Sequence, residues 1–170
     1  TPDDLGHMMA LISTATSNAA LADCDVVIEA VTENEELKTR IFGQLAPNLG
    51  PDTILASNTS TISVTRMASA TPDPTRFAGM HFFNPVDRMQ LVEVIRGEQS
   101  SDQPLSTLAS LARRMGKTPI ADKDRPPYTV NRILLPFIAE PLHLSLEGAS
   151  ADTIVRPATI IRLHHGSITL

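Results

Sequence analysis

Val26-Val27-Ile28-Glu29-Ala30-Val31 is a nearly continuous apolar run, and it decides how the rest of the chain is interpreted. A run of this kind, without alternation of apolar and polar residues, is typical of a strand that is covered on both faces. A helical pattern follows at residues 34–45, and a second short apolar run follows at residues 53–57. Strand, helix and strand in this order predict a βαβ unit and therefore a parallel sheet.

The same alternation continues along the chain. Apolar runs at residues 77–82, 91–95 and 118–121 predict three further strands. A short helix is expected over residues 61–70, and a longer helix is expected to begin with Asp102 as its N-cap and to close at Gly116. The predicted fold class is α/β with a mostly parallel sheet.

The composition changes at residues 122–127, which are polar and rich in proline. The apolar helical pattern that follows indicates the first helix of an all-α C-terminal domain, and Pro141 is expected to interrupt that helix. We therefore expect one domain over residues 1–124 and part of a helical domain over residues 125–170. Residues 151–170 show no clean period.

The composition also excludes several classes of protein. The 170 residues carry a formal net charge of -5, which argues against a nucleic-acid-binding surface. Cys24 is the only cysteine, so a disulfide framework is excluded and a reducing compartment is favoured. No apolar run reaches the roughly 18 residues of a membrane span, and no signal peptide is visible. We expect a cytoplasmic protein with no nucleic-acid partner and no membrane span.

Polar side chains follow the first three predicted strands, at residues 32–34, 58–60 and 81–85. Ligands of a parallel α/β sheet bind outside the carboxyl ends of its strands. The three loops therefore predict a site at that edge of the sheet, although such loops are polar in proteins without a site there as well.

His81 and Glu93 each lie inside an apolar run. Burial favours a neutral imidazole, and a neutral imidazole beside a carboxylate is the arrangement that a general base needs. An unpaired carboxylate within a strand is costly, so Glu93 is the candidate partner of His81. On spacing alone, a hydrogen-bonded core histidine and an edge-strand glutamate remain the alternative.

The other polar clusters are weaker candidates. A solvated helix start is the simplest interpretation of Glu33, Glu35, Glu36 and Lys38. The His164-His165 pair has no metal-ligand spacing, and no metal site is expected. No Gly-x-Gly-x-x-Gly segment, P-loop or Gly-x-Ser-x-Gly elbow occurs in the sequence.

Six blocks within residues 12–150 occur together in one order, at residues 25–31, 56–60, 79–85, 91–95, 116–119 and 130–132. They include Ser57-Asn58-Thr59-Ser60 and His81-Phe82-Phe83-Asn84-Pro85, and these two motifs at this separation are highly specific. In these blocks the chain resembles the L-3-hydroxyacyl-CoA dehydrogenases, including the dehydrogenase part of the bacterial multifunctional alpha subunit of fatty-acid oxidation.

The resemblance implies the oxidation of L-3-hydroxyacyl-CoA to 3-ketoacyl-CoA with NAD in fatty-acid β-oxidation. It implies that His81 is the general base and that Glu93 pairs with it. Ser60 resembles the hydroxyl that hydrogen-bonds the reacting oxygen of the substrate. Asn131 resembles an asparagine that helps to hold the substrate.

The resemblance also implies a set of cofactor contacts and partners. The expected contacts to NAD come from Ala30, Val31, Thr32, Glu33, Lys38, Ser60 and Asn84. Members of the family form dimers or multienzyme complexes.

The sequence departs from the family's pattern at three places. The strand and Gly-rich turn that cradle the NAD pyrophosphate are absent, so an incomplete Rossmann-type sheet is expected. Pro126-Pro127-Tyr128 stands where the family has Pro-Gly-aromatic, and residues 151–170 do not match. Two alternatives therefore stay open, a non-catalytic truncated remnant and a dehydrogenase of another 3-hydroxy acid.

Overall fold

The computed structural model describes residues 2–150 and 152–154. The chain divides into two compact units, Thr1–Tyr128 and Thr129–Leu170, and each is described by itself. The expected domains over residues 1–124 and 125–170 stay a prediction. His164, His165 and nearly all of residues 151–170 lie outside the described residues.

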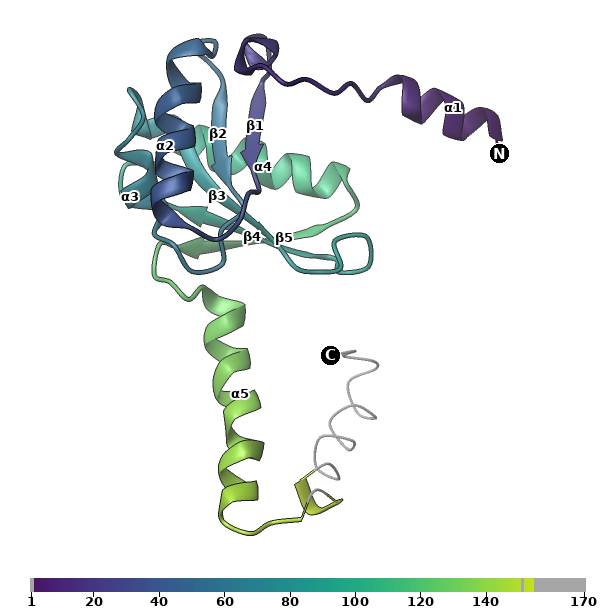
Figure 1. The fold of residues 1–170 in the computed structure, drawn as a ribbon, viewed down its shortest axis with the longest axis vertical. Helices are drawn as coiled ribbons and strands as arrows, with labels where there is room; N and C mark the ends of the chain where they lie inside the picture. Colours follow the sequence, from purple (N-terminus) through teal and green to yellow (C-terminus); the bar gives the residue numbers. More distant parts are fainter. Residues whose placement is uncertain (1, 151, 155–170) are drawn as a thin grey trace. The chain divides into compact units, whose positions relative to one another are not determined.

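The first unit is built on a five-stranded sheet in the order β1-β2-β3-β4-β5 (Figure 1). β1 to β3 are parallel, β4 runs antiparallel to β3, and β5 is parallel to β4. The expected α/β fold with a mostly parallel sheet is therefore confirmed. All five predicted strands are present, as β1 (Val26–Glu29), β2 (Ile54–Ser57), β3 (Phe77–Phe82), β4 (Leu91–Arg96) and β5 (Thr118–Lys123).

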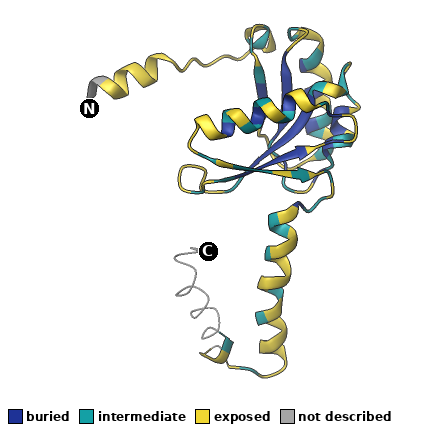
Figure 2. Ribbon diagram, turned by 180° about the vertical axis from the view of Figure 1, so that it is seen from behind, coloured by how far each residue is buried: buried dark blue, intermediate teal, exposed yellow. Residues whose placement is uncertain are grey.

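Helices cover both faces of this sheet. α2 (Glu35–Leu45) and α3 (Val64–Ala68) pack against one face, which we call the α2/α3 face, and α4 (Asp102–Arg114) packs against the other. Successive strand residues alternate between the two cores, since Leu55 lies in the α2/α3 core and Ala56 in the α4 core. The buried strands between the helices are dark blue in Figure 2.

Two predicted helix starts are wrong. Ser101, not Asp102, is the N-cap of α4, and Asp102 is its first residue, where its carboxylate pairs with Arg96 at 2.6 Å. α3 is shorter than the helix expected over residues 61–70, because Ser63 caps it and accepts the backbone N–H of Arg66.

Several short elements were not predicted, namely α1 (Pro2–Ala10) and the 3₁₀ turns η1 (Asn18–Leu21), η2 (Ala46–Asn48) and η3 (Pro74–Arg76). Gly116 does close α4, and its φ of 73° explains why a glycine stands there.

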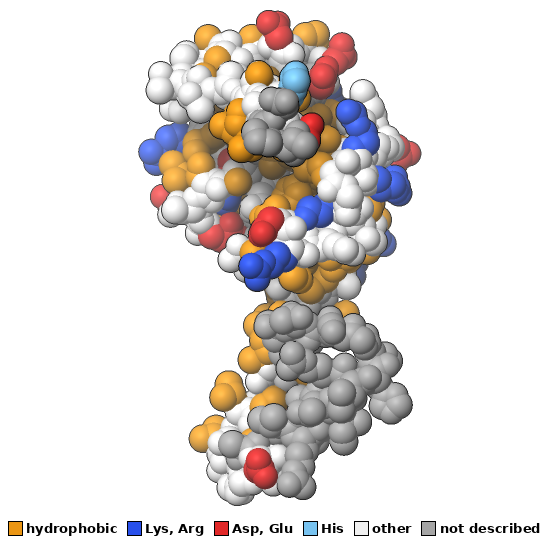
Figure 3. Space-filling view, turned by 90° about the vertical axis from the view of Figure 1, so that its right-hand side faces the viewer, with side chains coloured by type: hydrophobic (Ala, Val, Ile, Leu, Met, Phe, Trp, Pro, Cys, Tyr) orange, Lys and Arg blue, Asp and Glu red, His pale blue; other side chains and the backbone are white. Residues whose placement is uncertain are grey.

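The second unit contributes α5 (Thr129–Leu146) to the described part of the chain. The expectation that Pro141 interrupts this helix is wrong: α5 runs through Pro136 and Pro141, because the good helix formers around them carry the helix past the lost backbone donors. Large apolar side chains of α5 are exposed, and orange side chains are visible on this unit in Figure 3. Among the described residues, no helix is long and apolar enough to cross a membrane.

Candidate active site

The carboxyl ends of β1, β2 and β3 lie at one edge of the sheet, and the loops after them are joined by side-chain hydrogen bonds. The carboxylate of Glu33, after β1, accepts the Thr59 hydroxyl and the backbone N–H of Ser60, both after β2. Asn58 Oδ1 accepts the backbone N–H of Phe82, at the end of β3, at 2.9 Å. The structure therefore brings together the three polar loops that the sequence singled out.

His81 and Glu93 face each other directly across the antiparallel pair β3–β4. Residues opposite each other in such a pair project to the same face of the sheet. His81 Nδ1 lies 2.7 Å from Glu93 Oε2, and the two residues are only 4% and 0% exposed. Because β4 lies between β3 and β5, the alternative of an edge-strand glutamate is wrong.

Ser60 completes a line of three side chains, since its Oγ lies 2.9 Å from His81 Nε2. An ionised carboxylate can only accept, so beside it Nδ1 of His81 carries the proton. Nε2 then keeps its lone pair and accepts the Ser60 hydroxyl. This tautomer leaves the basic nitrogen at the loop edge rather than in the sheet.

Aromatic side chains surround the His81 ring. The ring of Phe83 lies 4.7 Å from it and that of Tyr128 lies 6.1 Å from it, measured between centroids. Tyr128 is fully buried, and its hydroxyl donates to the backbone carbonyl of Ile62 at 2.6 Å. Burial, together with the nearby carboxylates led by Asp124, raises the pKa of Tyr128, so this phenol stays a neutral donor.

The carboxylate of Glu33, which the resemblance places in contact with NAD, is already bonded within the protein. Its Oε1 accepts four hydrogen bonds from Thr59, Ser60 and Thr61. Partial burial is the largest influence on its pKa and works upward, yet these hydrogen bonds together hold the pKa of Glu33 below its ordinary value. Glu33 therefore ties the loop after β1 to the loop that carries Ser60.

The expectation that Lys38 belongs to a solvated helix start is wrong. It is fully buried on the α2/α3 face, and its Nζ lies 2.7 Å from Glu29 Oε1. The same Nζ donates to the carbonyl of Val31 at 3.1 Å and lies 3.6 Å from Glu33 Oε2. Lys38 shares one side of α2 with Phe42 and Leu45, at the spacing of a buried helical stripe.

Glu29 is the residue that sequence reasoning missed. Its Oε1 accepts Lys38 and the backbone N–H of Val31, and its Oε2 accepts the Ser57 hydroxyl at 2.7 Å. The signal was present in the sequence: Glu29 is a carboxylate within an apolar strand, which is the argument that singled out Glu93.

The remaining predicted residues are not drawn into this cluster. Ala30, Val31 and Thr32 are exposed after β1, and Asn84 is exposed after β3. Asn131 lies on α5 in the second unit, and its role stays a prediction.

The carboxyl edge of the sheet fits one end of the implied dinucleotide cofactor. Residues 30–32 are exposed, and the next residue, Glu33, is hydrogen-bonded to Ser60, which contacts His81. An exposed segment beside this pair suits the nicotinamide and ribose end of a dinucleotide. The backbone N–H of Val31 donates to the buried Glu29 carboxylate, so it is not available to the cofactor. Other backbone groups of residues 30–32 would make the contacts to the cofactor. The fit covers one end of the cofactor, because no Gly-rich turn for the pyrophosphate occurs in the sequence.

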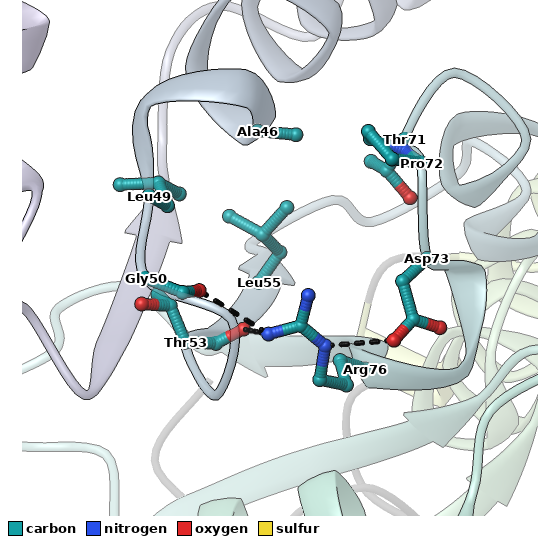
Figure 4. Close-up of a pocket in the computed structure, with 9 residues that line it drawn as sticks. All are labelled: Ala46, Leu49, Gly50, Thr53, Leu55, Thr71, Pro72, Asp73 and Arg76. Carbon is teal, nitrogen blue, oxygen red and sulfur yellow. Dashed lines mark hydrogen bonds and ion pairs between the residues drawn. The ribbon is translucent and has the colours of Figure 1, made fainter.

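Two hollows of the first unit lie away from this chemistry. One, of about 40 Å³, is lined by Arg76, whose guanidinium bonds Asp73 and the carbonyls of Gly50 and Thr53 (Figure 4). It lies at the amino ends of β2 and β3 and holds a few water molecules at most. A groove of about 420 Å³ runs between α4 and β5. Neither contains a residue of the Ser60–His81–Glu93 line, so we place the site by its chemistry and not by concavity.

Comparisons with known proteins identify the family of this chain. Residues 1–125 match the family model described as 3-hydroxyacyl-CoA dehydrogenase, NAD binding domain. Over 153 residues, 90% of the chain, it is 46% identical to the fatty acid oxidation complex subunit alpha of Acinetobacter baumannii. Over 151 residues, 88% of the chain, it is 43% identical to a probable 3-hydroxybutyryl-CoA dehydrogenase of Deinococcus radiodurans.

A solved structure is similar as well. The (S)-3-hydroxybutyryl-CoA dehydrogenase of Ralstonia eutropha superposes with a TM-score of 0.86 at 46% identity, over 89% of this chain and 54% of that one. The chain spans 21% of the Acinetobacter protein and 54% of the Deinococcus protein. The matched domain confirms NAD as the cofactor of the family. On these grounds the chain belongs to the 3-hydroxyacyl-CoA dehydrogenase family.

Proposed function

We propose that this chain carries the proton-transfer group of an NAD-dependent L-3-hydroxyacyl-CoA dehydrogenase, which oxidises the 3-hydroxyl to a ketone in fatty-acid β-oxidation. The observation that carries the proposal is the buried line Ser60 Oγ–His81 Nε2–Glu93, with His81 2.9 Å from Ser60 and 2.7 Å from Glu93. Such a line presents one basic nitrogen backed by a carboxylate.

His81 is the general base in this proposal. The hydroxyl proton of the substrate passes to Nε2, while the Nδ1–H of His81 remains bonded to Glu93. The imidazolium that forms is buried, and the Glu93 carboxylate balances its charge where water cannot. NAD, when bound, supplies the acceptor for the hydride that leaves C3. On substrate binding the Ser60 hydroxyl would turn its hydrogen bond from Nε2 to the reacting oxygen, which frees the lone pair of Nε2 for the substrate proton and keeps that oxygen beside it.

The other predicted contacts belong to the same proposal. Residues 30–32 and Asn84 would contact NAD, with Asn84 at the nicotinamide end. Lys38 is fully buried, so it would act on the cofactor through the segment it holds rather than through direct contact. Asn131 would help to hold the acyl-CoA substrate.

A turnover assay tests this function. We expect the chain to oxidise NADH with acetoacetyl-CoA and not with free acetoacetate. His81→Ala should abolish that oxidation, and His143→Gln, which changes an exposed histidine of α5, should not. Equal rates for His81→Ala and the unaltered chain would contradict the proposal, and oxidation of NADH by acetoacetate would favour a dehydrogenase of another 3-hydroxy acid.

A chimera separates chemistry from missing cofactor contacts. Residues 1–125 replace the matching segment of the Ralstonia enzyme, which supplies the rest of the molecule. Turnover in the chimera that is lost with His81→Ala supports the proposal. A folded chimera without turnover would identify this segment as a non-catalytic remnant.

We further propose that the chain works within a larger assembly. The similar Acinetobacter protein is named as a subunit of a fatty acid oxidation complex. The exposed apolar residues of α5, among them Ile133, Phe137 and Leu142, support burial against further protein. Sedimentation velocity tests this, and a monomer at all concentrations would contradict it.

A further inference from the structure

A line of polar groups connects Lys38, on α2, to His81, on β3. Lys38 Nζ lies 3.6 Å from Glu33 Oε2, and Glu33 Oε1 accepts the backbone N–H of Ser60 at 2.8 Å. Ser60 Oγ in turn lies 2.9 Å from His81 Nε2. The proposed proton-transfer group is therefore linked, through Ser60 and Glu33, to a second buried charge.

Lys38 is held in one position. Its ammonium is 0% exposed, and it donates to Glu29 Oε1 and to the carbonyl of Val31. Glu29 is fixed in turn by the Ser57 hydroxyl, from β2, and by the backbone N–H of Val31. A buried pair with this many hydrogen bonds has no freedom to move, so Nζ is a fixed positive point beneath Glu33.

Glu33 transmits that position to the Ser60 loop. One carboxylate oxygen faces Lys38, and the other gathers the hydroxyls of Thr59 and Thr61 and the backbone N–H groups of Ser60 and Thr61. The side chain of Glu33 is 37% exposed, so without Lys38 only the four hydrogen bonds to Oε1 would hold the carboxylate in place. The loop would then be held less firmly by its common acceptor.

We propose that Lys38, fixed by Glu29, is a positioning residue that holds Ser60 against His81 through the carboxylate of Glu33. This inference rests on the proposed function, because it assigns a purpose to the Ser60–His81 contact. Glu29 and Lys38 touch none of the reacting atoms.

The double variant Glu29→Gln/Lys38→Met separates positioning from simple stability. Removing Lys38 alone leaves the Glu29 carboxylate buried and unpaired, which destabilises the whole unit. Removing both charges avoids that cost, so the midpoint of urea unfolding should return close to that of the unaltered chain. In the double variant Glu33 still lacks its cation. If Lys38 positions Ser60, the Ser60 loop remains loosened although stability has returned. If Lys38 only stabilises the fold, the loop is not affected.

Hydrogen exchange on the full chain, followed by NMR, reads out the loop without cofactor or turnover. In the double variant we expect the amides of Ser60 and Thr61 to exchange about five- to tenfold faster, as expected when a hydrogen bond to a charged group is loosened. The ring ¹⁵N signal of Nε2 in His81 should also move toward that of a histidine without a bonded hydroxyl. Glu35→Gln, an exposed carboxylate pairing with Arg66, is the matched control and should change neither signal.

Glu33→Gln keeps the test decisive if the double variant fails to fold, because Glu33 is exposed and its amide form preserves the shape. Glu33→Gln should loosen the same two amides, and combining it with Glu29→Gln/Lys38→Met should loosen them no further. Unchanged exchange at Ser60 and Thr61 in Glu33→Gln or in a folded double variant, or additive effects of Glu33→Gln and Glu29→Gln/Lys38→Met, would overturn the inference. The proposed function fails by a different result, retained turnover in His81→Ala.

Discussion

Two buried carboxylates, Glu29 and Glu93, each have one principal side-chain partner on the same face of the sheet, and the two pairs differ in whether the partner has an atom at the loop edge. Lys38–Glu29 and His81–Glu93 each have a 2.7 Å contact and almost no exposure. In the first pair, the polar atoms of Lys38 and Glu29 are also bonded to Val31 and Ser57. In the second pair, the second ring nitrogen of His81 lies next to Ser60 at the loop edge.

The difference teaches where chemistry can occur. Opposite charges attract more strongly in a low dielectric, which favours the buried Lys38–Glu29 pair. An imidazole is the side chain most often used to accept and release a proton, and His81 has an atom at the edge where substrate would arrive. The Lys38–Glu29 pair is suited to holding structure, and the His81–Glu93 pair is suited to moving a proton.

Lys38→Met removes the cation of the Lys38–Glu29 pair and should have the largest effect on stability. The Glu29 carboxylate would remain buried without its cation, which costs about 3–5 kcal/mol of the free energy of unfolding. Urea unfolding followed by circular dichroism measures this loss. A stability equal to that of the unaltered chain would mean that Lys38 is not the counter-charge of Glu29.

Glu93→Gln breaks the second pair and should act on turnover instead. An amide in place of the carboxylate cannot balance the imidazolium, so we expect acetoacetyl-CoA reduction to slow by about 100-fold. The unfolding free energy should change by less than about 1 kcal/mol, because the amide oxygen can still accept the Nδ1–H of His81. The two pairs would be alike, and the comparison wrong, if Glu93→Gln lost stability and kept its rate.

Gly79→Ala probes the strand that carries His81. A Cβ at this position would lie 2.8 Å from Ile95 on β4 and 2.9 Å from Val64 on α3, so β4, α3 or β3 itself must shift. We expect a loss of about 1–3 kcal/mol in the free energy of unfolding. Gly43→Ala in α2 is the control: its Cβ meets only the carbonyl of Ala70, at 3.7 Å, and it should stabilise by about 0.5–1 kcal/mol. Equal effects of both changes would contradict the close approach of α3.

Asp124→Asn tests a carboxylate outside both pairs and should have the smallest effect. Asp124 accepts the Ser63 hydroxyl and the backbone N–H groups of Val64 and Thr65. Partial burial is the largest influence on its pKa and works upward, but these hydrogen bonds hold the pKa below the ordinary value of 3.8. A carboxyl whose pKa is lower in the folded than in the unfolded state stabilises the fold at any pH above its unfolded-state pKa. That contribution is lost as the pH falls through its folded-state pKa.

The expected difference between Asp124→Asn and the unaltered chain is about 1–2 kcal/mol near pH 7, and it should shrink as the pH falls below about 4. Urea unfolding at both pH values measures it. A difference that grows on acidification would have the wrong sign for a lowered pKa.

Much of the fold could be predicted because its strands are short apolar runs between clear helical patterns. His81 and Glu93 stood out because each is a polar residue in such a run. Their pairing was predicted from the cost of an unpaired carboxylate and from the family resemblance. The antiparallel register of β3 and β4 that places them opposite each other could not be predicted, because no local pattern fixes it.

Lys38 and Glu29 were misjudged for a related reason. Charges near a helix start are usually solvated, and nothing in the spacing of Glu29 and Lys38 shows that β1 and α2 bring them together. The start of α3 depends on Ser63 and on Asp124, which is distant in the sequence, so its length was also beyond a local pattern.

Chemical rescue tests most directly whether the imidazole of residue 81 takes the proton. His81→Ala is assayed for acetoacetyl-CoA reduction with and without added imidazole, in the chain or the chimera that shows turnover. We expect the rate to fall by about 10² to 10⁴-fold and to rise again with imidazole concentration. A rate in His81→Ala equal to that of the unaltered protein, with no response to imidazole, would contradict the account.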